Sequence, residues 1–145
     1  MIARLLVGSG LMAFCVVIHA AGVVWTLRTF TRLFDARARF WRGTWLFIRI
    51  FIWIVLLHLA EICVWAGYYS WRDAIPDPQS ALYFSAVTYT TTGYGDIVLP
   101  EEWRLLGAIE ALTGILMCGW STGFYFALVG RVYSAWTGTN QSSPS

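Results

Sequence analysis

Three long stretches of this chain lack the charged residues of an ordinary soluble protein, and they limit what it can fold into. No residue from Leu5 to Leu27 carries a formal charge. Two further apolar runs extend from Ile50 to Trp71 and from Leu105 to Gly130. A helix needs about 20 mostly apolar residues to cross the hydrocarbon core of a bilayer. The pattern predicts an all-α integral membrane protein with three transmembrane helices.

The composition agrees with this expectation. The chain is 58% hydrophobic and only 12% charged, whereas soluble domains carry about 25% charged residues. A net charge of +2 gives no reason to expect a nucleic-acid partner. Cys15, Cys63 and Cys118 lie apart within apolar runs, which is typical of free thiols that fill space.

Arginine placement predicts the orientation of the helices. Residues 28–43 contain five arginines and one acidic residue. Such loops stay in the cytoplasm, so we expect a multi-pass protein of the cell inner (plasma) membrane with its N-terminus outside and its C-terminus cytoplasmic. Residues 28–43 also place apolar side chains near one helical face, which predicts an interfacial helix. Anionic lipids are expected partners of the arginines between Arg28 and Arg42.

A short apolar segment between the second and third runs cannot cross the membrane. It begins at Asp77 and Pro78, a capping residue followed by proline at the first helical position. A helix from Pro78 to Thr90 is about 20 Å long, so it enters from the outer side and stops partway. Its C-terminus carries about half a negative elementary charge, which favours a cation inside the membrane.

The residues after this helix predict a cation path made of backbone oxygens. Glycines at 93 and 95 permit left-handed backbone angles, so that successive carbonyls can turn the same way. One copy of Thr91 to Gly95 cannot enclose an ion, but four copies around an axis can. The spacing therefore predicts a homotetramer, in which Thr91 adds a hydroxyl oxygen at the inner end.

The segment ALYFSAVTYTTTGYGD, residues 81–96, resembles the pore helix and selectivity filter of the tetrameric potassium channel family. The signature of that family is T-V-G-Y-G followed by Asp. The resemblance extends over residues 44–131 and implies a pore domain of outer helix, pore helix, filter and inner helix. Residues 1–27 are then an extra N-terminal transmembrane helix, and residues 132–145 a short disordered cytoplasmic tail.

The resemblance also implies roles for individual residues. Potassium ions, the permeant ligand, would bind the carbonyls of Thr91, Thr92, Gly93, Tyr94 and Gly95. Tyr94 would pack behind the filter against Tyr83 and Phe84, and Asp96 would hold the outer end by hydrogen bonds. Gly114 would be the hinge of the inner helix. The inner cavity would be lined by Ile115, Cys118, Thr122 and Phe126.

Two positions depart from the family pattern. Thr92 stands where the family has valine, and its hydroxyl needs a partner behind the filter. Val87 stands where some members carry a glutamate that pairs with the filter aspartate. Asp96 must therefore find a different partner, and nearby Trp or Tyr side chains are the candidates.

Three ionisable residues inside the predicted spans have two interpretations. His58 and Glu61 are three positions apart and share a helix face, and Glu110 lies in the outer part of the third span. They form either a proton-sensitive cluster that gates the pore or structural hydrogen bonds to the pore helix and its neighbours. His19, alone in the first span, is expected to be a packed, hydrogen-bonded histidine.

Together these features predict a potassium-selective channel that conducts passively and needs no organic cofactor. No nucleophile arrangement or phosphate-binding loop is visible in the sequence, so an enzyme is not expected. Two alternatives stay open, a weakly selective cation channel and a non-conducting membrane subunit.

Overall fold

The computed structural model describes residues 2–33 and 40–141, and this part of the chain is helical with short connections. The elements are α1 (Ile2–Leu33), α2 (Phe40–Trp71), α3 (Pro78–Tyr89), the 3₁₀ turn η1 (Glu101–Trp103) and α4 (Arg104–Gln141). Three segments are long and apolar enough to cross a membrane, Ile2–Thr29, Gly43–Trp71 and Glu101–Ser134. The predicted all-α membrane fold with three spanning helices is confirmed.

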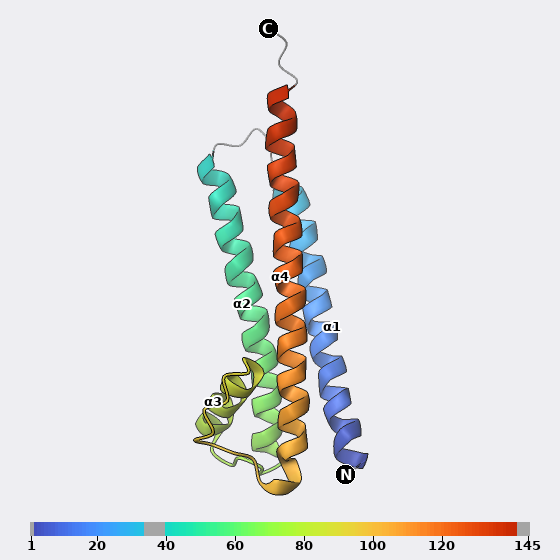
Figure 1. Ribbon diagram of the computed structural model, residues 1–145, viewed down its shortest axis with the longest axis vertical. Helices are drawn as coiled ribbons and strands as arrows, with labels where there is room; N and C mark the ends of the chain where they lie inside the picture. The colour runs from blue at the N-terminus through green and yellow to red at the C-terminus, as the bar shows by residue number, and fades with distance from the viewer. Residues whose placement is uncertain (1, 34–39, 142–145) are drawn as a thin grey trace.

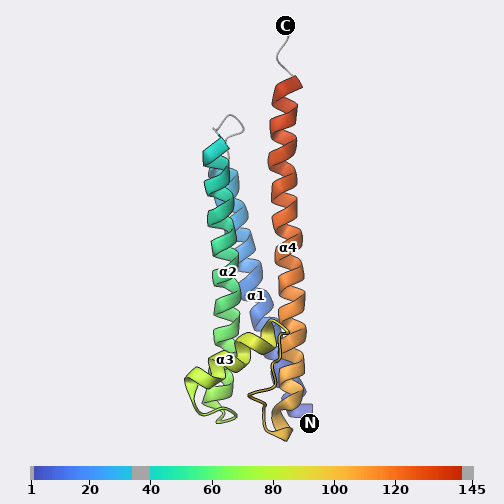
Figure 2. The same cartoon turned by 60° about the vertical axis from the view of Figure 1, so that its left-hand side comes forward.

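The three long helices run lengthwise, and α3 lies at the end of the molecule that holds the N-terminus (Figure 1). From that end α3 rises beside α4, and the chain then returns to the same end before α4 begins (Figure 2). α3 packs against α2 and α4, while α1 packs against the same two long helices. The short helix is therefore re-entrant, as predicted.

The start of α3 has the predicted cap. Asp77 Oδ2 accepts hydrogen bonds from Ser80 N at 2.8 Å and Ser80 Oγ at 2.6 Å, and Pro78 occupies the first turn. The Ser80 hydroxyl and then the Ser80 amide lower the pKa of Asp77. The helix ends at Tyr89 with Thr90 as its C-cap.

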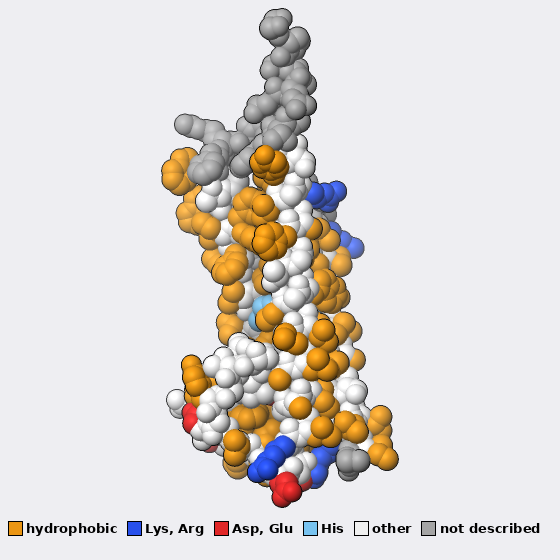
Figure 3. All heavy atoms as spheres, viewed as in Figure 1, with side chains coloured by type: hydrophobic (Ala, Val, Ile, Leu, Met, Phe, Trp, Pro, Cys, Tyr) orange, Lys and Arg blue, Asp and Glu red, His pale blue; other side chains and the backbone are white. Residues whose placement is uncertain are grey.

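The side of the bundle is largely apolar. Hydrophobic side chains cover the length of the helices, and charged groups gather towards the ends in Figure 3. Two buried clusters hold the helices together. The larger includes Trp65, Tyr69 and Tyr89, and the smaller includes Ile54 and Leu128. The exposed apolar side chains suit a surface that faces lipid or other membrane-embedded protein.

The ends of the long helices differ from the sequence-based boundaries. Residues 28–33 continue α1 and residues 40–43 begin α2, so these parts of the predicted interfacial helix belong to the long helices. Residues 34–39 of that prediction lie outside the described residues. α4 continues to Gln141 through most of the predicted disordered tail, because each added residue gains one helical hydrogen bond and no proline occurs between Arg104 and Gln141.

Candidate functional site

The loop after α3 alternates its backbone conformation. Thr91, Gly93 and Gly95 have φ angles of 58°, 52° and 77°, so every second residue is left-handed. This alternation is what turns successive carbonyls to one side of an extended segment. Glycine adopts the conformation without steric cost, but Thr91 does not, so the loop holds Thr91 in place against its own preference.

Hydrogen bonds fold the start of this loop back onto α3. The Thr91 amide donates to Thr88 O at 2.9 Å, and the Gly93 amide donates to Val87 O at 3.0 Å. Val87 therefore supports the loop through its backbone carbonyl. The hydrogen bonds from these two amides fix where the left-handed residues begin relative to the end of α3.

The hydroxyl of Thr92 has a partner within its own chain. Thr90 Oγ1 donates to Ala86 O at 2.7 Å and lies 3.0 Å from Thr92 Oγ1. Because the Thr90 proton is directed at Ala86, Thr92 donates to Thr90. The departure from valine thus adds a hydrogen bond between the loop and the C-cap of α3.

Asp96, which follows the last left-handed residue of the loop, is hydrogen-bonded to Tyr83 on α3. The Tyr83 hydroxyl donates to Asp96 Oδ2 at 2.7 Å, which lowers the pKa of Asp96 and raises that of Tyr83. Tyr83 is thus the tyrosine partner that the sequence left to be found. The predicted packing of Tyr94 on Tyr83 and Phe84 is not made within one chain, since Tyr94 is 72% exposed and Phe84 instead packs edge-on against Tyr69.

Gly114 is a contact residue between helices. A Cβ built there would overlap the backbone carbonyl of Tyr89 at the end of α3. The predicted role was a hinge, and the structure adds a different reason for glycine, close passage of α4 against α3. The predicted cavity residues are all exposed on the single chain: Ile115, Cys118, Thr122 and Phe126.

A closed ring of hydrogen bonds joins the four α-helices near the end of α3. Glu61 Oε1 lies 2.8 Å from His19 Nδ1, and Glu61 Oε2 accepts from the Tyr89 hydroxyl. The Tyr89 oxygen lies 3.1 Å from His58 Nδ1. Ser121 Oγ closes the ring, 3.1 Å from His58 Nε2 and 2.9 Å from His19 Nε2. We call these five residues the polar ring.

Counting protons gives the charge at which the polar ring is complete. Each of its five contacts needs one proton. The two hydroxyls and the two imidazoles supply four, and a fifth sits on Glu61 or on a second nitrogen of one histidine. In either arrangement every contact is made and the net charge is zero. A sixth proton would leave a positive charge among buried side chains, which is unfavourable.

Glu110 is not part of the polar ring. Its Oε2 accepts from the Tyr69 hydroxyl at 2.8 Å, and Tyr69 lies two helical turns beyond Glu61, about 12 Å along α2. Glu110 Oε1 and Ser85 Oγ are buried without a hydrogen-bond partner among the described residues. The structure therefore brings His58 and Glu61 together but keeps Glu110 apart from them.

Sequence reasoning missed two members of the polar ring. His19 is the packed, hydrogen-bonded histidine that was expected, with 0% exposure. Tyr89 had a usable signal, since it is a polar-tipped aromatic on the last turn of a helix that stops inside the membrane. Ser121 had none, because a serine within a helix commonly bonds its own backbone.

Three side chains of the polar ring also have donor atoms at metal-ligand spacing. The atoms offered by His19, His58 and Glu61 lie within 4.8 Å of one another. Each of them already takes part in a ring contact, so a metal ion would have to displace the protons that those contacts share. The geometry supports the hydrogen-bonded arrangement.

Comparison with known proteins gives a family match. A family model described as "Ion channel" matches residues 44–131, which include α3, the loop and most of α2 and α4. No curated protein and no solved structure matches the chain.

Proposed function

The chain belongs to the ion channel family, and on that premise we propose that it is a potassium-selective channel whose pore is built by four copies. The alternating left-handed backbone at Thr91, Gly93 and Gly95 carries the proposal. Such a backbone presents a row of carbonyl oxygens, which can replace the hydration shell of a potassium ion. The path needs no charged ligand, so ions can leave as readily as they arrive.

Four copies are needed because one copy offers oxygens from only one side. Residues 91–95 are all exposed on the single chain, and within this range Tyr94 is 72% exposed. Phe126 on α4 is 70% exposed. Neighbouring copies would cover Tyr94, which finds no place against its own α3. The same assembly would place the exposed residues of α4 around an inner cavity.

Ions would pass down their electrochemical gradient. The C-terminal end of α3 points towards α4, within the bundle of long helices (Figure 2), and its partial negative charge would stabilise a cation there. Residues 72–104 hold five acidic residues and two arginines, which raises the local cation concentration at that mouth.

The polar ring would position the inner end of the filter. It holds Tyr89, two residues before Thr91, through Glu61 and His58 on α2. Gly114 lets α4 pack against the Tyr89 carbonyl at the C-terminal end of α3. These contacts favour the structural interpretation of the histidines and Glu61, and the proton count predicts that the structure depends on pH.

Purified protein in liposomes tests the proposal. We expect a reversal potential close to the potassium equilibrium potential in a potassium/sodium gradient, and a current that barium blocks. A reversal potential near zero would support the weakly selective cation channel instead. No barium-sensitive current would support the non-conducting subunit. Gly93→Ala, which cannot easily take a φ of 52°, is expected to abolish the current.

A further inference from the structure

Arg49 is a charged residue within the second membrane span, which extends from Gly43 to Trp71. Charged side chains inside spans usually pair with another group or reach towards the headgroups. Among the described residues Arg49 has no acidic partner, and it is exposed. Its guanidinium needs an anion or water, and its surroundings indicate which anion.

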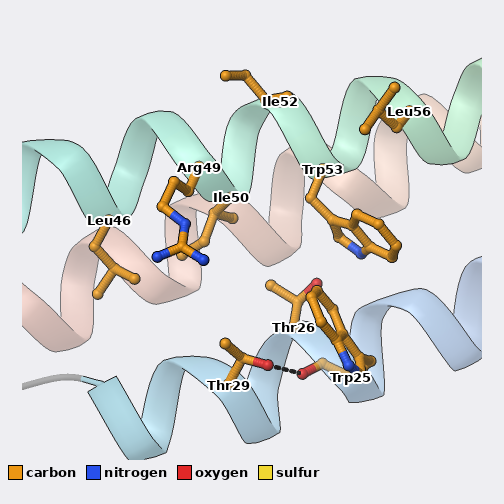
Figure 4. Close-up of a pocket in the computed structure, with 9 residues that line it drawn as sticks. All are labelled: Trp25, Thr26, Thr29, Leu46, Arg49, Ile50, Ile52, Trp53 and Leu56. Carbon is orange, nitrogen blue, oxygen red and sulfur yellow. Dashed lines mark hydrogen bonds between the residues drawn. The ribbon is translucent and has the colours of Figure 1, made fainter.

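The Arg49 side chain lines a cavity of about 230 Å³ between α1 and α2 (Figure 4). No acidic residue lines it, and its wall is otherwise mostly apolar: Trp25, Leu46, Ile50, Ile52, Trp53 and Leu56. The guanidinium extends into the space between the two helices, and the rings of Trp25 and Trp53 lie beside each other further along, with centroids 4.5 Å apart. The cavity is therefore amphipathic, with one cation at one end.

A second polar group lies at the deeper end. Trp53 Nε1 is buried and has no hydrogen-bond partner among the described residues. It follows Arg49 by one helical turn, about 6 Å nearer the middle of the span. A phosphate on Arg49 would place the glycerol ester carbonyls of the same molecule near this donor. The hydroxyls of Thr26 and Thr29 donate to backbone carbonyls of their own helix. They therefore do not compete with Trp53 Nε1 for the ester carbonyl.

We propose that this cavity binds an anionic phospholipid of the leaflet nearest the connection between α1 and α2. The phosphate would contact Arg49, an ester carbonyl would accept from Trp53 Nε1, and an acyl chain would lie along Ile52 and Leu56. Ile52 is 52% exposed and Leu56 49% exposed, so the cavity is open to the lipid that supplies its occupant. This site lies beyond the arginines between Arg28 and Arg42 and does not depend on ion selectivity.

Native mass spectrometry of the full chain tests the site, with phosphatidylglycerol and phosphatidylcholine of identical acyl chains as probes. We expect the tightest site to prefer phosphatidylglycerol. Both lipids carry the phosphate, but only phosphatidylglycerol has a net negative charge. Arg49→Gln should therefore lower the preference about fivefold, the effect of one basic residue near anionic lipid, while Arg49→Lys should keep most of it. Trp53→Phe should weaken both lipids alike, because their ester carbonyls are the same.

Arg131→Gln is the matched control, since Arg131 is an exposed arginine on α4 away from the cavity. The proposal is overturned if Arg49→Gln and wild type show the same preference, or if Arg131→Gln lowers it equally. Inorganic phosphate provides the last arm. If millimolar phosphate displaces phosphatidylglycerol, the site binds phosphate and the lipid assignment is wrong.

Discussion

At Gly114 the backbone of α4 passes so close to the carbonyl of Tyr89 that a methyl group cannot fit between them. The end of α3 and the middle of α4 thus meet through backbone atoms at the base of the loop that connects them. A residue that sequence comparison presents as a hinge is, within one chain, a packing requirement.

The first prediction concerns this contact. Gly114→Ala is expected to destabilise the protein by about 1–3 kcal/mol, because an added methyl group in a filled site forces the backbone to shift. Gly119→Ala is the matched control, since nothing lies within 4 Å of a Cβ there and alanine favours a helix by up to about 1 kcal/mol. Thermal unfolding of both variants measures the difference. Equal effects would contradict the packing role of Gly114.

The second prediction concerns the polar ring. We expect lower potassium flux at pH 5.5 than at pH 7.5, because an extra proton places a positive charge among Glu61, the buried His19 and the partly buried His58. Glu61→Gln should flatten this pH dependence, since the glutamine side-chain amide changes the number of protons in the polar ring. Glu110→Gln keeps the polar ring intact and should behave as wild type. Identical pH curves for wild type and Glu61→Gln would remove the gating role.

The third prediction concerns Asp96. Its lowered pKa means that the Tyr83 contact stabilises the folded protein above the ordinary carboxyl range and that this contribution is lost as the pH falls through the lowered pKa. Tyr83→Phe should raise the pKa of Asp96 towards its usual value. Carboxyl titration by NMR measures the shift. An unchanged titration would show that Tyr83 is not the partner of Asp96 in the membrane.

The fourth prediction concerns Thr92. Thr92→Val removes the hydroxyl bonded to Thr90 and keeps the shape of the side chain. We expect an unchanged reversal potential and a stability loss of about 1 kcal/mol or less, because the proposed ligand is the carbonyl. Thr91→Val, which removes a proposed ligand hydroxyl, is the contrasting variant and should reduce conductance. A large selectivity change in Thr92→Val would assign the hydroxyl to the ion path.

Local chemistry made much of the fold predictable. The apolar runs located the three long helices, and Asp77 with Pro78 located the start of α3, because a cap acts on residues next to it. The glycines at 93 and 95 predicted the left-handed positions for the same reason. The helix ends near residues 28–43 were harder to predict, since no proline or glycine lies between Leu27 and Arg42 to mark them.

The contacts between helices were not predictable in the same way. Tyr89 and Ser121 meet the histidines across 31 to 102 positions of sequence, and the sequence carries no signal that specifies such distances. The resemblance implied a hinge at Gly114, and the sequence did not show that Tyr89, on another helix, lies against it. Tyr94 is exposed on a single chain, and no local pattern records which contacts cover it in the proposed assembly.

The polar ring also affects which truncated versions of this protein can keep their structure. The region that matches the channel family starts at residue 44, yet His19 of α1 is a member of the ring that holds Tyr89. Removing α1 would take away the His19 imidazole, which is a hydrogen-bond partner of both Glu61 and Ser121. We therefore expect the matched region alone to be less stable than the full chain, because α1 supplies one member of the polar ring.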